Sequence, residues 1–160
     1  MDEERPPEEE TPKERADREL IELLNELRVV LPGITVLLAF LVAVPFAKGW
    51  TRVDEFQRDV FVVAFLSTAV SVVLLTAPSS YHRLRFRHGD KARIVRIANR
   101  LSIAGIAASA VSLEAVVLLV TDFVLSRGAA IAAAAGLLVV IGALWYALPL
   151  WAALRDRSAR

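Results

Sequence analysis

The sequence predicts an all-α fold: a four-helix transmembrane bundle preceded by an amphipathic helix and a disordered acidic tail. Two observations on its 160 residues lead to this class. Hydrophobic residues make up 56% of the chain and charged residues 23%, and the two kinds are segregated along it. Eleven of the eighteen acidic residues precede Arg28, whereas four long stretches carry almost no charge. Segregation of this kind is typical of membrane proteins.

The N-terminal segment is expected to contain a tail and a helix. Residues 1–13 hold three prolines and a run of three glutamates, so they bury too little apolar surface to offset the entropy of ordering. From residue 14 to 28, Leu20, Leu24 and Leu27 recur on one stripe among charged side chains. This pattern predicts an amphipathic helix at the inner membrane surface. Residues 14–160 are then expected to form a single membrane domain.

Four apolar segments are predicted to cross the bilayer, at about residues 29–47, 60–77, 101–125 and 129–154. Each is long enough to cross ~30 Å of hydrocarbon at ~1.5 Å per residue. Pro78 is expected to end the second span. A soluble bundle of four buried helices would show a polar stripe on each segment. None of the four has one, which favours the membrane.

The distribution of Lys and Arg predicts the orientation. Fifteen of them lie in the N-terminal segment, in the loop 79–100 and after the fourth span, against four in the other two loops. Cytoplasmic loops carry such an excess, so we expect the inner (plasma) membrane, with both termini and the basic loop 79–100 in the cytoplasm. This loop is expected to attract anionic lipid headgroups, and helical spacing of Ile94, Ile97 and Leu101 predicts an interfacial helix within it.

Glu114 is the candidate proton-binding residue because it lies near the middle of the third span. An ionised carboxylate at that depth costs ~2.5–3.5 kcal/mol, so it must be protonated, paired, hydrated or surrounded by polar groups. The small and polar face of the second span, with Ser67, Thr68 and Ser71, is the expected source of hydrogen bonds to it. Two interpretations stay open: Glu114 binds a transported proton, or a permanently protonated carboxyl holds two helices together.

The third span is expected to pack on two sides. Thr121 shares the helical face of Glu114, whereas Gly105, Ser109 and Ser112 cluster about 180° away. Small and hydroxyl side chains on both faces allow close approach of another helix on each.

Further candidates lie at the membrane boundaries. Asp122 is placed near the outer boundary, either as an interfacial residue or in a vestibule leading to Glu114. Pro78, His82 and Arg83 form a motif at the cytoplasmic end of the second span. A histidine there is suited to proton shuttling, and is also common as a plain interfacial residue.

Other kinds of site find no support in the sequence. There is no cysteine, no Gly-rich phosphate loop, no zinc-protease motif and no nucleophile elbow. The two histidines, separated by a flexible basic segment, make a poor metal site. We therefore expect no catalytic residue, no cofactor, no metal and no nucleic-acid partner, and no enzymatic activity.

Residues 22–46, 56–65 and 77–87 resemble a family of small four-span bacterial membrane proteins of unknown function. The most recognisable positions are Arg28, Gly33 and Asp59, together with Pro78, His82 and Arg83. Members of the family are often labelled sodium:proton antiporters. The resemblance thus implies Na⁺ and H⁺ as ligands, without assigning a role to any residue.

Two functions are consistent with these observations. The first is a proton-coupled, antiporter-like carrier, which is expected to act as a homo-oligomer because four helices offer little interior. The second is a non-catalytic membrane scaffold or accessory module. It would bind anionic lipid through the basic loop and a protein partner through the acidic tail.

Overall fold

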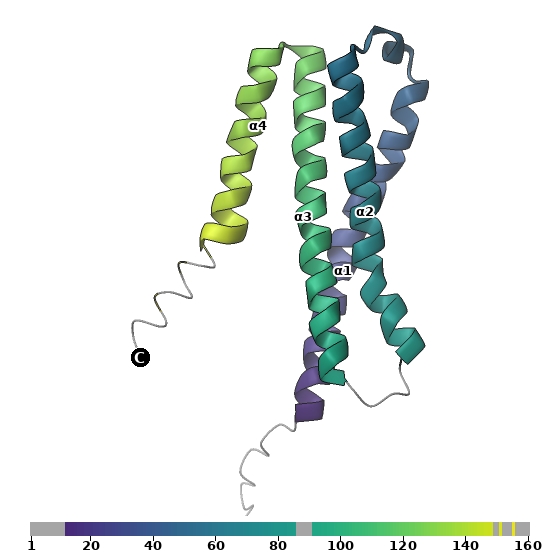
Figure 1. Ribbon diagram of the computed structural model, residues 1–160, viewed down its shortest axis with the longest axis vertical. Helices are drawn as coiled ribbons and strands as arrows, with labels where there is room; N and C mark the ends of the chain where they lie inside the picture. Colours follow the sequence, from purple (N-terminus) through teal and green to yellow (C-terminus); the bar gives the residue numbers. More distant parts are fainter. Residues whose placement is uncertain (1–11, 86–90, 149–150, 152–154, 156–160) are drawn as a thin grey trace, which may run out of the picture.

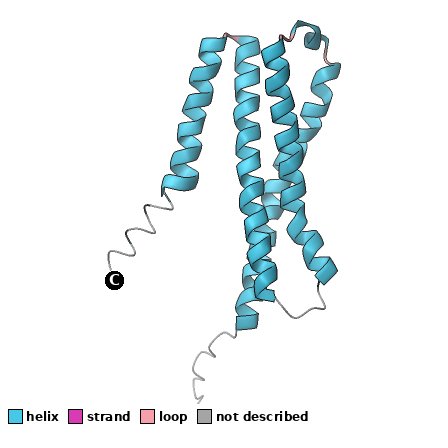
Figure 2. Cartoon of the chain, in the orientation of Figure 1, coloured by secondary structure: helices cyan, strands magenta, loops and turns pink. Residues whose placement is uncertain are grey.

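A computed structural model describes residues 12–85, 91–148, 151 and 155 of the chain. Nearly all of the described residues are helical (Figure 2). The predicted acidic tail, apart from its last two residues, lies outside the described residues. The same holds for the end of the predicted fourth span, residues 149–154, apart from Trp151.

The described chain contains four long helices, of which the last continues as a π-helix. Each holds a stretch long and apolar enough to cross a membrane, which confirms the predicted fold class. The two connections α1–α2 and α3–α4 lie at one end of the molecule, whereas α1 begins and α2 ends at the other (Figure 1). The elements are α1 (Pro12–Ala43), the 3₁₀ turns η1 (Val44–Phe46) and η2 (Lys48–Arg52), α2 (Glu55–Arg85), α3 (Lys91–Val124), α4 (Arg127–Ile141) and the π-helix η3 (Gly142–Ala147).

The helices α1, α2 and α3 are longer than the spans predicted for them. The segment 14–28 and most of the predicted first span, up to Ala43, form one continuous helix of 32 residues, rather than a surface helix followed by a span. At ~1.5 Å per residue, α1 is therefore longer than the ~30 Å hydrocarbon core. The prediction that Pro78 ends its helix is wrong, because α2 continues to Arg85. Proline removes one backbone hydrogen bond, and membrane helices tolerate that loss where neighbouring helices cover it, as they do at the buried Pro78.

The centre of the fold is an antiparallel seam between α2 and α3. In both helices the buried residues recur every three or four positions, the spacing of a coiled-coil interface. Most of them are small or carry a hydroxyl, which lets the two backbones approach closely. The buried residues are Gln57, Phe61, Ala64, Thr68, Ser71, Leu75 and Pro78 on α2, and Ala98, Ser102, Gly105, Ser109, Ser112, Ala115 and Leu119 on α3.

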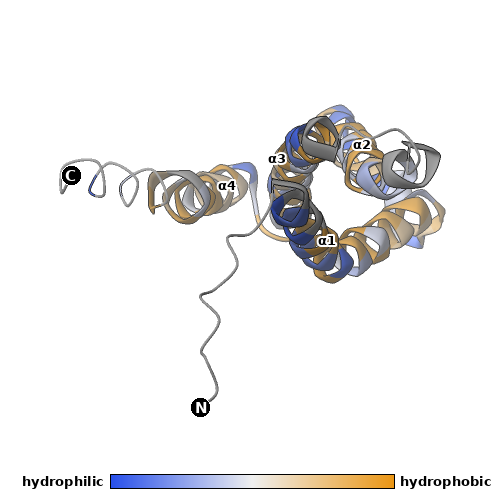
Figure 3. Ribbon diagram, turned by 90° about the horizontal axis from the view of Figure 1, so that it is seen from below, coloured by the Kyte–Doolittle hydropathy of each residue, from blue (hydrophilic) through white to orange (hydrophobic). Residues whose placement is uncertain are grey.

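The helix α1 covers this seam on one side. Its buried residues Leu27, Ile34 and Leu41 lie seven positions apart and therefore on one stripe. Leu41 packs in a cluster with Phe61 of α2 and with residues of α3, and Leu27 and Ile34 pack with Leu75. The helices α1, α2 and α3 thus form a three-helix bundle (Figure 3).

The helix α4 stands beside this bundle. Within the described part of the chain its backbone packs against α3 and not against α1 or α2, and its first residue, Arg127, reaches Phe56 of α2. Figure 3, which looks along the bundle from below, shows α4 next to α3 and on the side away from the other two helices. Ser126 caps its start by accepting a hydrogen bond from the backbone N–H of Ala129 at 3.3 Å.

The outward-facing surface of the spans is apolar. Val29 is 80% exposed and Phe46 86% exposed, and many other large hydrophobic side chains of all four helices face outward. A water-soluble bundle would place polar residues there, whereas the hydrocarbon of a bilayer solvates such a surface.

Candidate functional site around Glu114

Glu114 lies on the face of α3 that points away from α2. At 100° per residue it is about 180° from Gly105 and about 160° from Ser112, both of which lie in the α2–α3 seam. Besides α2, α3 contacts α1 and α4, and α4 lies on the side of α3 opposite to α2 (Figure 3). The third span therefore packs on two sides, as predicted, and Glu114 belongs to its α4 side.

The Oε1 atom of Glu114 is buried and has no hydrogen-bond partner among the described residues. The inward face of α4 offers none, since residues 128–144, which form α4 after Arg127 and the start of η3, consist only of Gly, Ala, Ile, Leu and Val. Its buried positions Ala130 and Ile141 are apolar as well. Buried polar atoms nearly always have a partner, so an exception within a membrane span is a candidate functional group.

The hydroxyl groups of α2 do not bind Glu114, contrary to the prediction. Thr68 donates to the backbone oxygen of Ala64 at 2.6 Å and pairs with the Ser112 hydroxyl. Ser71 donates to the backbone oxygen of Gly105 at 2.8 Å. The Thr68–Ser112 and Ser71–Gly105 bonds join α2 to α3, on the far side of α3 from Glu114.

Neither Ser67 nor Thr121 donates a hydrogen bond to Oε1 of Glu114. Ser67 donates to the backbone oxygen of Val63, four residues earlier in its own helix, at 2.6 Å. Thr121 lies two turns from Glu114 on the same face and is partly buried. Among the described residues, none of the predicted supporting side chains thus donates a hydrogen bond to Oε1 of Glu114.

Asp122 belongs to a polar cluster that ties three helices together at the end of the bundle. Its side chain is 4% exposed. It accepts hydrogen bonds from Gln57 Nε2 at 2.8 Å, and from Arg127 Nε at 2.9 Å and Nη2 at 3.1 Å. Arg127 also donates to Asp54 at 2.8 Å and lies over the ring of Phe56, 3.8 Å from its centroid. Both carboxylate oxygens of Asp122 therefore accept hydrogen bonds from Gln57 or Arg127. This favours a structural role for Asp122 rather than a place in a vestibule leading to Glu114.

Asp54 and Gln57 reach this cluster through the start of α2. The Gln57 N–H donates to Asp54 Oδ1 at 2.8 Å, and the Asp54 N–H donates to Gln57 Oε1 at 3.2 Å. This is a capping box, in which two side chains satisfy each other's backbone donors at a helix start. The spacing Asp54-x-x-Gln57 could have been found in the sequence, whereas its link to Asp122 could not.

Replacing Arg127 by methionine is expected to lower the thermal unfolding midpoint in detergent by several degrees. The change leaves the nearly buried carboxylate of Asp122 with one neutral donor, and it frees Asp54 from α4. The control is Arg58→Met at an exposed position of α2, with little change expected. Equal midpoints for the two variants would show that the cluster does not stabilise the fold.

The boundary motif is partly outside the described residues. Pro78 is buried in the α2–α3 seam. His82 and Arg83 belong to the last turns of α2, and their side chains lie outside the described part of the chain. Among the described residues, no group of three or more His, Cys, Asp or Glu side chains is placed to hold a metal ion.

These features define the class of the protein as a multi-pass membrane protein with four apolar helices and a glutamate with one buried carboxyl oxygen in the third. The chain matches, over residues 9–149, the model of a family of unknown function, DUF6328, and it belongs to that family. The matched range contains Glu114 and the Asp122 cluster. No curated protein and no solved structure matches the chain. The family has no assigned function, so the match gives no residue of this chain a role.

Proposed function

We propose that the protein is a proton-coupled carrier of the sodium:proton exchange type, with Glu114 as its proton-binding group. The observation that supports this proposal is the buried Oε1 of Glu114, which lacks a partner among the described residues. Carboxyl groups at such depth are costly to keep, and in membrane proteins they mark proton relays and ion pathways. A carboxyl that served only to join two helices would be expected to have a hydrogen-bond partner on the neighbouring helix.

Exchange follows from competition at one carboxyl group. The carboxylate attracts a cation, and the protonated acid does not, so one site holds either a proton or a cation. A carrier that exposes this site first to one side of the membrane and then to the other exchanges the two. Beyond its first residue, Arg127, α4 packs against α3 alone, which supports the remaining length of α4 as the element that moves.

The carrier is proposed to act as a homo-oligomer. A cation beside Glu114 needs further oxygen ligands at this depth, and the facing stretch of α4, residues 128–144, carries none. A second copy that approaches α3 and α4 can supply them, together with water. This arrangement would also cover α4, which has most of its apolar surface exposed in one protomer.

The proposed location is the inner (plasma) membrane, with both termini and the basic loop in the cytoplasm. The excess of Lys and Arg at that end supports it. Proton and cation exchange involves no covalent chemistry, so no enzymatic activity is proposed.

Transport is tested with the purified protein in proteoliposomes that contain a pH-sensitive dye. A pH gradient is imposed, and Na⁺, K⁺ or Li⁺ is then added outside. The proposal predicts that at least one of these cations dissipates the gradient faster than in protein-free vesicles. Equal rates with and without protein for all three cations would contradict it.

A second candidate function is a non-catalytic scaffold or accessory module that binds anionic lipid and a protein partner. A polar groove between the cytoplasmic ends of α1 and α3 favours it. Three exposed glutamates of one α1 face border this groove, so a basic segment of a partner would fit there. The groove is lined by Glu19, Glu22, Leu23 and Glu26 of α1 and by Val95, Arg96 and Asn99 of α3. Failure of transport together with capture of a basic peptide would favour this function.

A further inference from the structure

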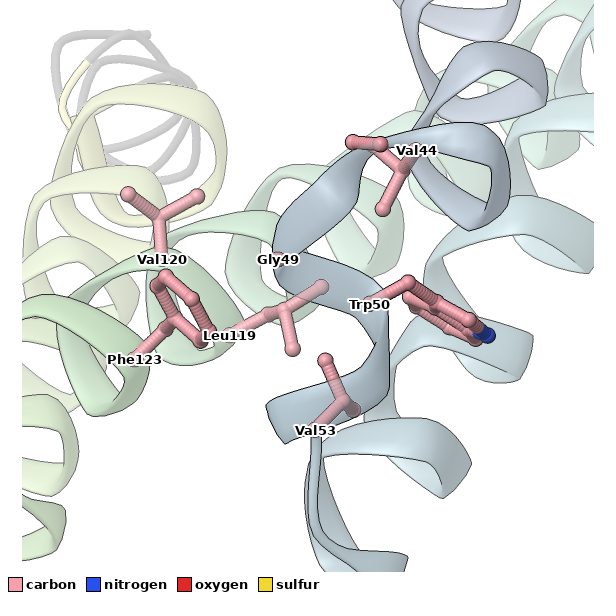
Figure 4. Close-up of a pocket in the computed structure, with 8 residues that line it drawn as sticks. Val44, Gly49, Trp50, Val53, Leu119, Val120 and Phe123 are labelled. Atoms are coloured by element: carbon pink, nitrogen blue, oxygen red, sulfur yellow. The ribbon is translucent and has the colours of Figure 1, made fainter.

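We propose that a cavity beside η2 is a binding site for one acyl chain of an anionic phospholipid, with the headgroup held by Lys48 and Arg52. The cavity lies between the α1–α2 connection and the last turns of α3 (Figure 4). It is separate from Glu114, which does not line it, so this site stands or falls independently of proton transport.

The lining of the cavity is apolar throughout. Its volume is about 210 Å³, and its lining residues are Val44, Ala47, Gly49, Trp50, Val53, Leu119, Val120 and Phe123. Figure 4 shows the side chains of α3 on one side and those of η2 and its flanking residues on the other. The cavity is open on one side, so hydrocarbon can enter it from the bilayer, and its volume holds part of one acyl chain. At the end of two membrane-spanning stretches, the surrounding solvent is lipid hydrocarbon.

The walls of the cavity are held in place by packing. The Trp50 ring meets the Phe61 ring of α2 edge to face, with 4.8 Å between their centroids, and it packs against the cluster that contains Leu41 and Leu119. A tryptophan at this position is also suited to the boundary between hydrocarbon and headgroups. A chain in the cavity would therefore have its polar end near the level of η2.

The charges of η2 select the headgroup. Lys48 and Arg52 flank the lining residues Gly49 and Trp50, and both are exposed. No acidic residue lies between residues 44 and 53, and the next one, Asp54, is already paired with Arg127 at 2.8 Å. Lys48 and Arg52 form no ion pair with a described residue, and two such positive charges next to an apolar cavity complement a phosphate on an acyl chain.

Gly49 keeps the cavity open. A Cβ atom built at this position would lie 3.4 Å from Cζ of Phe123, on the opposite wall. Alanine is therefore accommodated, whereas a longer side chain would occupy the space of the acyl chain. This position provides a variant that fills the cavity without touching the charges.

The site is tested by quenching of Trp50 fluorescence in vesicles of phosphatidylcholine. The variant Trp145→Phe/Trp151→Phe leaves Trp50 as the one tryptophan of the chain. Brominated phosphatidylglycerol or brominated phosphatidylcholine is added at the same low mole fraction. The proposal predicts stronger quenching by the phosphatidylglycerol. In this background, Lys48→Gln and Arg52→Gln should each lower the enrichment of phosphatidylglycerol at Trp50 about fivefold. This factor corresponds to the attraction of about 1 kcal/mol between one basic residue and an anionic membrane surface.

Two control variants separate the cavity from general effects of charge and bulk. Arg58→Gln removes a charge at the same end of the molecule but outside η2, and it should leave the enrichment unchanged. Gly49→Leu should abolish the enrichment, whereas Gly136→Leu on α4, where no atom lies within 4 Å of the added Cβ, should not. Equal quenching by both lipids, or enrichment that survives both Lys48→Gln/Arg52→Gln and Gly49→Leu, would overturn the proposal.

Discussion

Replacing Glu114 by glutamine is expected to reduce cation-driven proton flux in proteoliposomes to the rate of protein-free vesicles. The amide has nearly the same shape as the carboxyl, but it does not take up and release a proton and carries no negative charge to attract a cation. Because Glu114 has no hydrogen-bonded partner at Oε1, no described neighbour can take over its role. Glu114→Asp keeps a carboxyl one methylene shorter and is expected to retain part of the flux.

The matched control is Glu55→Gln, at an exposed position in the first turn of α2. It removes the same charge at the end of the bundle and should leave the flux unchanged. Glu114→Gln should also leave the unfolding midpoint in detergent unchanged, so that a loss of flux is not a loss of fold. Flux that persists at the rate of the unsubstituted protein would remove Glu114 from the mechanism.

Replacing Gly105 by alanine is expected to destabilise the protein by about 1–3 kcal/mol, the usual cost of overpacking a close-packed core. A Cβ atom at this position would lie 2.7 Å from both Cγ and Cδ2 of Leu75, and 3.3 Å from Cβ of Leu74. Leu75 is fully buried, so its side chain cannot simply rotate away. The displacement must also disturb the hydrogen bond from Ser71 to the Gly105 oxygen.

The same substitution in α4 provides the comparison. Gly136→Ala adds a methyl group where no atom lies within 4 Å, so it should be neutral or stabilising by up to ~1 kcal/mol, because alanine favours helix. Unfolding of both variants is followed by circular dichroism in detergent. If Gly105→Ala is as stable as Gly136→Ala, then α2 and α3 do not pack as closely as described.

The spans could be predicted from the sequence because hydrophobic and charged residues are segregated, and the bilayer imposes that pattern on each helix separately. The two packing faces of α3 could also be predicted, since the positions of Gly105, Ser112 and Glu114 around a helix follow from geometry. The ends of the helices were harder to predict. Pro78 removes one backbone hydrogen bond, but packing against α3 carries α2 beyond it.

The pairing of faces could not be predicted. The periodic pattern defines a polar face with Thr68 and Ser71 on α2, and two faces with small or polar residues on α3, but it does not say which of these two meets α2. Small residues allow the closest approach, so the Gly105 face pairs with α2 and Glu114 is left for α4. The bond from Gln57 to Asp122 joins residues 65 positions apart, and no local pattern encodes such a distance in sequence.

The proposed alternation of Glu114 between a proton and a cation can be measured by labelling with dicyclohexylcarbodiimide. This apolar reagent reacts with protonated carboxyl groups inside membranes, and the labelled residue is identified by mass spectrometry of peptides. We expect labelling at Glu114 that is slowed by the same cation that drives proton flux. Labelling of Glu114 at the same rate whichever cation is present would identify it as a permanently protonated structural residue and would rule out exchange at this site.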